Sequence, residues 1–191
     1  MSHLSILGTG NMGQAIASVA AEGGHSVQLL GQNDTDSPIT GDVVVLAVPH
    51  PAVATVIDQR GDQLAGKVVV DITNPLDFET FDSLVVPAEA SAAAEIAAAL
   101  PESRVLKAFN TTFAGTLTAG TVGASTTTVL IAGDDADAKS TLAGIVTSGG
   151  LKAIDAGSLK RARELEALGF LQISLAASEK VSWTGGFAIQ A

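Results

Sequence analysis

The fold is decided by the stretch Leu4-Ser5-Ile6-Leu7-Gly8-Thr9-Gly10-Asn11-Met12-Gly13, an apolar run that leads into the pattern G-x-G-x-x-G. A helix-forming segment, residues 14–22, follows directly. In such a strand–turn–helix, Gly8 allows the sharp turn, Gly10 leaves room for a pyrophosphate, and Gly13 lets the helix lie close to the strand. The N-terminus of the helix then presents N–H groups to phosphate oxygens. The stretch therefore predicts a dinucleotide-binding turn.

The composition narrows the class of protein. Hydrophobic residues make up 47% of the 191 residues and aromatic residues only 4%, which fits a parallel sheet buried on both faces. A formal net charge of −10 argues against a nucleic-acid partner, because phosphate backbones are bound by clustered Lys and Arg. The absence of cysteine excludes disulfides and thiolate chemistry. No apolar run is long enough for a membrane span and no signal-peptide pattern is visible, so we expect a soluble, cytoplasmic protein with one domain over residues 1–191.

Strand-like and helix-like segments alternate along the chain. The predicted strands cover residues 4–7, 26–30, 43–48, 68–72, 104–108, 127–132 and 152–154, and the predicted helices cover 14–22, 52–60, 88–100, 136–148 and 159–177. This alternation is typical of βαβ units with right-handed crossovers. We therefore predict an α/β fold: a Rossmann-type, doubly wound, mostly parallel sheet with helices on both faces.

The connection between the second and third predicted strands is poor in helix formers. Residues 31–41 are mostly Gly, Asn, Asp, Thr, Ser and Pro, whereas a βαβ crossover needs at least about ten to twelve residues that can form its helix. We predict a bare loop here and a sheet that is shortened after its second strand. One face of that strand is then left for the loop, or for a partner subunit, to cover.

The end of the second predicted strand bears on which dinucleotide is bound. An NAD site usually has an acidic residue there for the ribose hydroxyls, whereas this chain has Gly31, followed by Gln32 and Asn33. The missing acid favours NADP. An arginine for the 2′-phosphate is missing as well, so NAD stays possible. Gln32 and Asn33 either bind the adenosine end through neutral hydrogen bonds or are solvated turn residues.

Turns also follow the carboxyl ends of other predicted strands, the edge at which open α/β sheets bind ligands. Their candidate site residues are Pro49 and His50, then Thr73, Asn74 and Pro75, and finally Asn110. The two asparagines suit a carboxamide or ring carbonyl, because a neutral amide both donates and accepts hydrogen bonds; asparagine is also an ordinary turn former. The histidine either contacts a ligand or is held in a turn by its proline neighbours.

The charged and aromatic residues show no catalytic triad and no metal-ligand cluster, so we predict neither a catalytic side chain nor a metal. Hydride transfer needs neither, since the dinucleotide supplies the chemistry and the fold supplies alignment. Asp71 is predicted to accept backbone N–H groups of the loop that follows it. Trp183 and Phe187 either cover the site or lie in a dimer interface. A solvated helix face is predicted for Lys160, Arg161, Arg163 and Glu166.

Several segments together resemble one enzyme family. They are Ile6–Gly13, Val43–Pro49, Val70–Leu76, Ser91–Glu95, Val105–Thr111, Asp155–Gly157 and Ala162–Glu166. Over nearly its whole length the chain is similar to the NADP-dependent deazaflavin reductases, the coenzyme F-420-dependent NADP oxidoreductases, and to the cytoplasmic domains of the STEAP metalloreductases. The most specific segment is Lys107–Thr111, which generic Rossmann domains lack.

The resemblance implies a hydride passed between NADPH and a flat, flavin-like ring stacked on the nicotinamide. It implies a pyrophosphate site at Thr9, Gly10, Asn11 and Met12, a ribose and diphosphate lining at Ala47, Val48 and Pro49, and nicotinamide contacts at Asn74, Pro75 and Asn110. The family's Ser-Arg or Thr-Arg pair for the 2′-phosphate is replaced here by Gln32-Asn33.

We therefore predict an oxidoreductase that transfers a hydride between NADP(H) and a planar small-molecule acceptor of the flavin, deazaflavin or quinone type. The alternative is a non-catalytic NAD(P)-binding redox sensor or partner subunit. A dehydrogenase of small hydroxy acids is a third hypothesis; it would need a Lys or His as acid/base, and Lys107 is its only candidate. The exposed sheet edge and the aromatic tail favour a homodimer.

Overall fold

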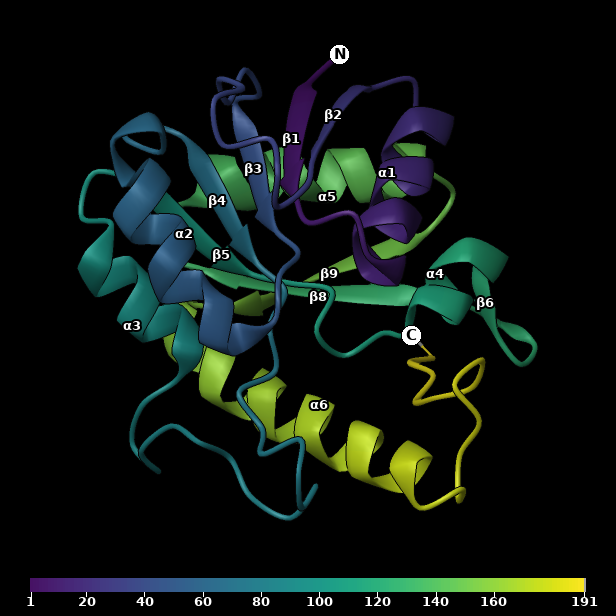
Figure 1. Cartoon of the computed structure of the whole chain (residues 1–191). Coiled ribbons are helices and arrows are strands. Elements are labelled where there is room, and N and C mark those ends of the chain that lie inside the picture. The colour runs from purple at the N-terminus through teal and green to yellow at the C-terminus, as the bar shows by residue number, and fades with distance from the viewer. Residues whose placement is uncertain (191) are drawn as a thin grey trace.

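Seven strands form the central sheet, in the order β2-β1-β3-β4-β5-β8-β9 (Figure 1). The computed structural model describes residues 1–190. Its strands are β1 (His3–Leu7), β2 (Ser26–Leu30), β3 (Val43–Leu46), β4 (Val68–Asp71), β5 (Arg104–Lys107), β8 (Thr128–Gly133) and β9 (Lys152–Gly157). Neighbouring strands are parallel except β5 and β8, which are antiparallel. The predicted α/β class and mostly parallel sheet are confirmed.

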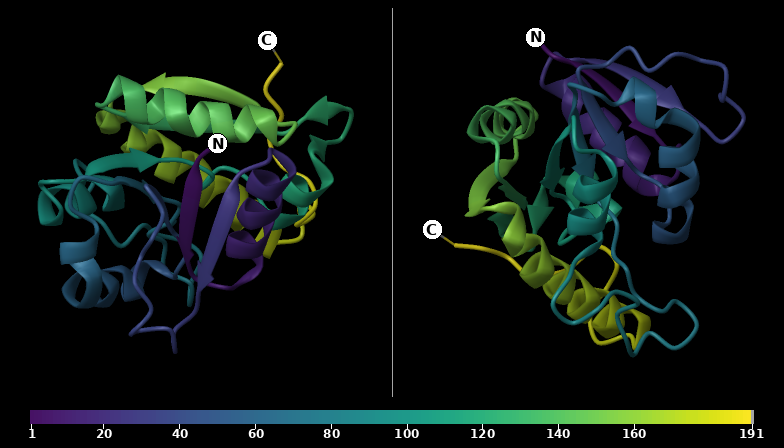
Figure 2. Two further views of the ribbon diagram at one scale, coloured as in Figure 1. Left: turned by 90° about the horizontal axis from the view of Figure 1, so that it is seen from above. Right: turned by 90° about the vertical axis from the view of Figure 1, so that its left-hand side faces the viewer.

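Helices cover both faces of this sheet, and a further helix lies at the carboxyl ends of its strands (Figures 1 and 2). One face carries α1 (Asn11–Glu22), α4 (Ala114–Ala119) and α5 (Ala136–Ser148), and the other carries α2 (Val53–Arg60) and α3 (Ala92–Ala99). The last helix, α6 (Ala162–Ala177), lies along the carboxyl edge of the strands. Short pieces complete the chain: η1 (His50–Ala52), η2 (Gly61–Gln63), η3 (Leu159–Arg161), and the hairpin of β6 (Thr121–Val122) and β7 (Ser125–Thr126). No helix within residues 1–190 is long and apolar enough to cross a bilayer.

The central strands bury side chains on both faces, as their apolar sequences require. In β3, Val43 and Val45 join the core cluster that contains α1 and α5, whereas Val44 and Leu46 join the one that contains α2 and α3. All four side chains are at most 1% exposed. Two hydrophobic cores therefore pack against opposite faces of the sheet. They hold the carboxyl ends of its strands in place.

Four of the five predicted helices begin at other residues than the pattern predicts; α2 and α6 start at Val53 and Ala162, each after a short 3-10 turn. Helix α1 starts at Asn11, so Met12 and Gly13 already belong to its first turn. Helix α3 starts at Ala92 and not at residue 88, because the Ser91 side chain accepts a hydrogen bond from the Ala94 N–H and caps the helix. Helix α4 and the β6–β7 hairpin escape sequence prediction, because segments this short show no clear periodicity.

Residues 31–41 form a loop without a helix, as predicted, and β2 is the edge strand (Figure 2). The order of the sheet's first five strands, β2-β1-β3-β4-β5, is the one that remains when the third strand of the order 3-2-1-4-5-6 is removed, and β8 and β9 extend the sheet beyond β5. The loop itself covers one face of the edge strand: Ile39 is 7% exposed and packs in the same cluster as Leu30. Gln28 of β2 binds the loop as well, since its Nε2 donates to the Pro38 carbonyl (2.9 Å) and its Oε1 accepts from the Thr40 N–H (3.2 Å).

Candidate functional site

The turn between β1 and α1 contains backbone contacts that only glycine permits. Gly8 has a φ of +121°, and a Cβ on it would clash with the carbonyl oxygen of Ala47. A Cβ on Gly13 would clash with the carbonyl oxygen of Gly8. Both positions therefore set how closely strand, turn and helix approach one another.

Gly10 has a different role from these two glycines. Its φ of −72° and ψ of −178° suit any residue, and a Cβ on it would meet no atom within 4 Å. Gly10 is also the N-cap of α1, where no side chain caps the helix, and both Gly10 and Asn11 are exposed. The open space and the uncapped first turn form a cradle that fits a pyrophosphate, because helix N-termini bind phosphate oxygens through such N–H groups.

The ends of β2 and β3 flank this turn. The Gly8 N–H donates to the Leu30 carbonyl (2.8 Å), and the Ala47 N–H donates to the Leu7 carbonyl (2.8 Å). The candidate residues Gly31, Gln32 and Asn33 therefore follow one flanking strand, and Ala47, Val48, Pro49 and His50 follow the other. The Nδ1 atom of His50 is buried and has no hydrogen-bond partner among residues 1–190.

Asn74 and Asn110, which follow β4 and β5, bind each other. The Asn74 Nδ2 donates to the Asn110 carbonyl (2.9 Å), and the Asn110 Nδ2 donates to the Asn74 Oδ1 (3.0 Å). The Asn110 Nδ2 also donates to the carbonyl of Leu165 in α6 (2.8 Å). Two buried atoms, the Oδ1 of Asn110 itself and the Oγ1 of Thr73, which precedes Asn74 in the chain, have no partner in the described part of the protein. The structure thus brings the two asparagines together and leaves polar atoms for a further group.

Helix α6 approaches the asparagine pair through Gly169. A Cβ on Gly169 would clash with the Asn74 Oδ1 and would lie 2.9 Å from both the Nδ2 and the carbonyl oxygen of Asn110. The helix can therefore lie this close only where it has no side chain. This contact was not predicted from the sequence, where Gly169 is an isolated glycine in a helical pattern.

Replacement of Gly169 by Ala should lower the free energy of unfolding by about 1–3 kcal/mol, because the added methyl group forces α6 and the asparagines apart. Urea denaturation measures the change. Gly144→Ala in α5 is the matched control, since its Cβ would meet no atom within 4 Å, and it should add about 0.5–1 kcal/mol of stability. If both variants were stabilised alike, the close approach of α6 would be contradicted.

Lys107, Asp71 and Glu166 form a buried ion cluster close to the asparagine pair in the chain and in the fold. The Lys107 Nζ donates to the Asp71 Oδ2 (2.7 Å), to the Thr73 carbonyl (2.6 Å) and to the Glu166 Oε1 (2.9 Å). These three bonds use every proton of the ammonium group. The charged side chains are 0–1% exposed. The other oxygen of Asp71 accepts from the Thr73 N–H (2.8 Å), as predicted, so the cluster holds the backbone just before Asn74.

Glu166 does not lie on the solvated helix face that the pattern predicts, and that prediction is wrong. Its side chain is 1% exposed, and its carboxylate accepts from the N–H groups of Ala92 (2.9 Å) and Ala93 (3.2 Å). A carboxylate at a helix N-terminus is favourable, so Glu166 joins α6 to α3. One sequence signal could have found the cluster: Lys107 interrupts an apolar strand, and a buried lysine requires a partner.

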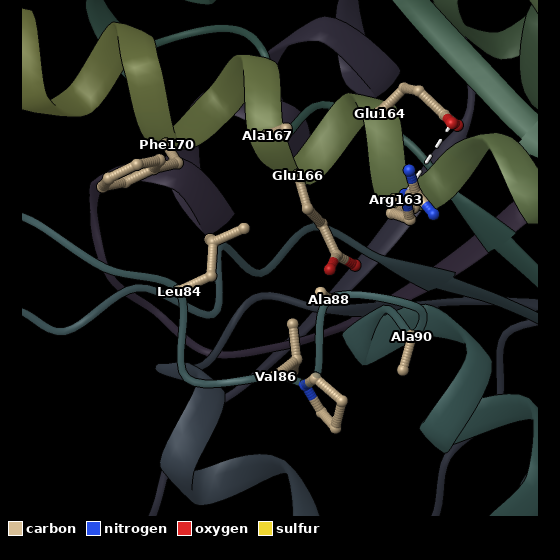
Figure 3. Close-up of a pocket in the computed structure, with 10 residues that line it drawn as sticks. Leu84, Val86, Ala88, Ala90, Arg163, Glu164, Glu166, Ala167 and Phe170 are labelled. Carbon is tan, nitrogen blue, oxygen red and sulfur yellow. Dashed lines mark ion pairs between the residues drawn. The ribbon is translucent and has the colours of Figure 1, made fainter.

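A cavity of about 470 Å³ lies between α6 and the loop of residues 84–90 (Figure 3). Its wall is mainly apolar, and one of its polar lining residues is Glu166, which also belongs to the ion cluster. Arg163 stands at the same end but is paired with Glu89 (3.2 Å) and lies 3.9 Å from Glu164. The lining residues are Leu84, Val86, Pro87, Ala88, Ala90, Arg163, Glu164, Glu166, Ala167 and Phe170. Sequence patterns could not indicate this cavity, because the loop has no periodic structure.

The loop that leads to this cavity is ordered by its own side chains. The Thr80 hydroxyl (2.8 Å) and the Glu79 N–H (2.8 Å) donate to the Asp77 carboxylate and hold the pKa of Asp77 below its usual value. The hydroxyl of Ser174 in α6 donates to the Phe81 carbonyl (2.9 Å). The loop is therefore attached to the helix that also contacts Asn74.

The aromatic tail folds back onto the protein. The Trp183 ring lies 5.0 Å from that of Phe113, measured between ring centroids, and the Phe187 N–H donates to the Gln172 Oε1 of α6 (3.1 Å). Neither aromatic residue lines the 470 Å³ cavity. Both are about half exposed, and the homodimer stays a prediction.

A shortened doubly wound sheet with an uncapped glycine turn where its strand order reverses defines a dinucleotide-binding domain of the Rossmann type. The family described as "NADP oxidoreductase coenzyme F420-dependent" matches residues 29–75. The F420-dependent NADP reductase of Methanocaldococcus jannaschii is 31% identical over 166 residues, which are 85% of this chain and 74% of that protein. The chain therefore belongs to the family of F420-dependent NADP reductases, and the predicted resemblance and oxidoreductase class are confirmed.

Further relatives agree with this assignment. The F420-dependent NADP reductase of Methanothermobacter thermautotrophicus is 32% identical over 85% of this chain and 72% of its own length. The metalloreductase STEAP3 of Rattus norvegicus is 33% identical over 86% of this chain, which spans only 36% of that protein. Among solved structures, that of a proposed F420-dependent NADP reductase from Arthrobacter sp. FB24 superposes over the full length of both chains, with a TM-score of 0.86 and 26% identity.

Proposed function

We propose that this chain transfers a hydride between NADP(H) and a planar small-molecule acceptor, with a deazaflavin as the first choice. The observation that carries this proposal is the cradle at Gly10, an uncapped helix N-terminus beside open space. It lies at the same sheet edge as the Asn74–Asn110 pair, because β1, β3, β4 and β5 are parallel. When bound, the dinucleotide supplies the hydride chemistry.

The candidate cofactor residues divide into three groups along this edge. The residues that follow β1 bind the pyrophosphate, those that follow β2 bind the adenosine end, and those that follow β3, β4 and β5 bind the nicotinamide half. In that order they are Gly8, Thr9, Gly10, Asn11, Met12 and Gly13; Gly31, Gln32 and Asn33; and Ala47, Val48, Pro49, His50, Thr73, Asn74, Pro75 and Asn110.

The amide and hydroxyl groups at the nicotinamide end can orient a ligand through hydrogen bonds. The unpaired Asn110 Oδ1 can accept from a carboxamide, and the unpaired Thr73 hydroxyl can donate to one. Lys107 and Gly169 fix the backbone and amides around these atoms. This suits hydride transfer, which depends on alignment of the two reacting rings.

The acceptor class is supported by the relatives, whose names contain both F420 and NADP. Anaerobic mixing of the protein with NADPH and an oxidised deazaflavin should consume both in equal amounts, with a hyperbolic dependence on deazaflavin. Flavin and quinone acceptors, tested in parallel, define the range of substrates. Tight binding of NADPH without turnover on any of these acceptors would contradict the proposal and would favour the non-catalytic redox sensor.

A further inference from the structure

The loop after β2 places the carboxylate of Asp34 beside Gly31, the residue at the end of the strand that has no side chain of its own. An ideal Cβ on Gly31 would lie 3.4 Å from the Asp34 Oδ2 and 3.5 Å from the Thr9 Cγ2. Position 31 is where dinucleotide domains specific for NAD have an Asp or Glu for the ribose hydroxyls. The Asp34 oxygen therefore stands within the reach of an acidic side chain at position 31, although it comes from three residues further along.

Backbone hydrogen bonds hold this carboxylate in place. The Gly31 N–H donates to the Asp34 Oδ2 (2.7 Å), and the Asp34 N–H donates to the Gly31 carbonyl (3.2 Å). Asp34 is exposed, so a ligand can reach its carboxylate. Thr9, which lies between Gly8 and Gly10 in the turn, borders the same space. The acid thus belongs to the edge of the proposed cofactor site.

No cation in this loop balances the carboxylate, since residues 31–41 contain neither Lys nor Arg. The nearby Arg60 is 8% exposed and donates to the backbone carbonyls of Asp34 (3.4 Å) and Ser37. Its guanidinium thus binds the backbone of the loop and not the Asp34 carboxylate. A 2′-phosphate at this place would meet a negative charge, whereas a 2′-hydroxyl can donate a hydrogen bond to it.

We infer that Asp34 is a specificity-determining residue that brings the affinity for NAD(H) to within about tenfold of the affinity for NADP(H). This inference rests on the proposed function, because it concerns the same dinucleotide site. It adds that the site accepts both dinucleotides, and that one exposed carboxylate sets the ratio between them.

Calorimetric titration of the whole protein with NADPH and with NADH tests the inference. Asp34→Asn keeps an oxygen for the Gly31 N–H and removes the charge. We expect it to raise the affinity for NADPH about tenfold and to leave the affinity for NADH unchanged or lower. Asp36→Asn is the matched control, because it removes an exposed charge from the same loop and should shift the ratio of the two affinities by less than about twofold.

The outcomes separate this inference from the proposed function. An unchanged ratio in Asp34→Asn, an equal shift in Asp36→Asn, or a preference of the unmodified protein for NADPH well above about tenfold would each overturn the role of Asp34. If neither dinucleotide bound the unmodified protein, the proposed function would fail first. Melting temperatures without ligand show that each variant is folded.

Discussion

Gly10→Val should lose most dinucleotide binding while the protein stays folded. The backbone at Gly10 suits any residue and the space beside it is empty of protein atoms, so the valine side chain disturbs only what binds there. We expect the affinity for NADPH to fall at least about a hundredfold, which corresponds to about 2.7 kcal/mol. In a thermal-shift experiment, NADPH at about a hundred times its Kd should stabilise the unmodified protein by about 2.7 kcal/mol and Gly10→Val hardly at all.

A matched control separates loss of the cradle from a general effect of valine. Gly144 in α5 also has open space beside it, and Gly144→Val should bind NADPH like the unmodified protein. The melting temperature of Gly10→Val without ligand should stay within a few degrees of the original. Unchanged NADPH affinity in Gly10→Val would remove the pyrophosphate from this turn and with it the central observation behind the proposed function.

Lys107→Met should lower the free energy of unfolding by about 3–5 kcal/mol, because it leaves the carboxylates of Asp71 and Glu166 buried without a cation. A loss of this size is a large part of the stability of a typical domain. The Thr73 carbonyl loses its partner as well. Denaturant unfolding, followed by circular dichroism, measures the change.

Two further variants test whether charge is the cause. Lys160 is exposed, and Lys160→Met should change the stability by less than about 0.5 kcal/mol. The combination of Lys107→Met with Asp71→Asn and Glu166→Gln should recover part of the loss, since it removes the buried charges together. If Lys107→Met cost no more than Lys160→Met, the ion cluster would not stabilise the fold.

Local patterns in the sequence were enough to predict the strands of the large sheet, the glycine turn and the loop of residues 31–41. The spacing of Gly8, Gly10 and Gly13 predicted the turn, and apolar runs predicted each strand of the large sheet. The composition of residues 31–41 predicted a loop in place of a crossover helix. These features depend on neighbours a few residues apart in the chain, where steric limits on the backbone and the periodicity of burial act directly.

The family was also visible in the sequence, because its segments keep their order and spacing around the sheet edge. The comparison with the M. jannaschii reductase confirms it. The acceptor was not visible, since a planar ring is recognised by the shape of a pocket built from several loops. The cavity between α6 and residues 84–90 joins segments that are far apart in the chain, and no local pattern marks it.

The sequence alone was enough to predict a doubly wound sheet and a glycine-rich turn between β1 and α1. The folded structure was needed to show that Glu166 is buried against Lys107 and that Gly169 meets the Asn74–Asn110 pair. The partners in these contacts lie far apart along the chain. Glu166 meets the Ala92 N–H across 74 residues and Asn110 meets Leu165 across 55, and the partner of a charge or an amide is known only once the fold has brought the two together.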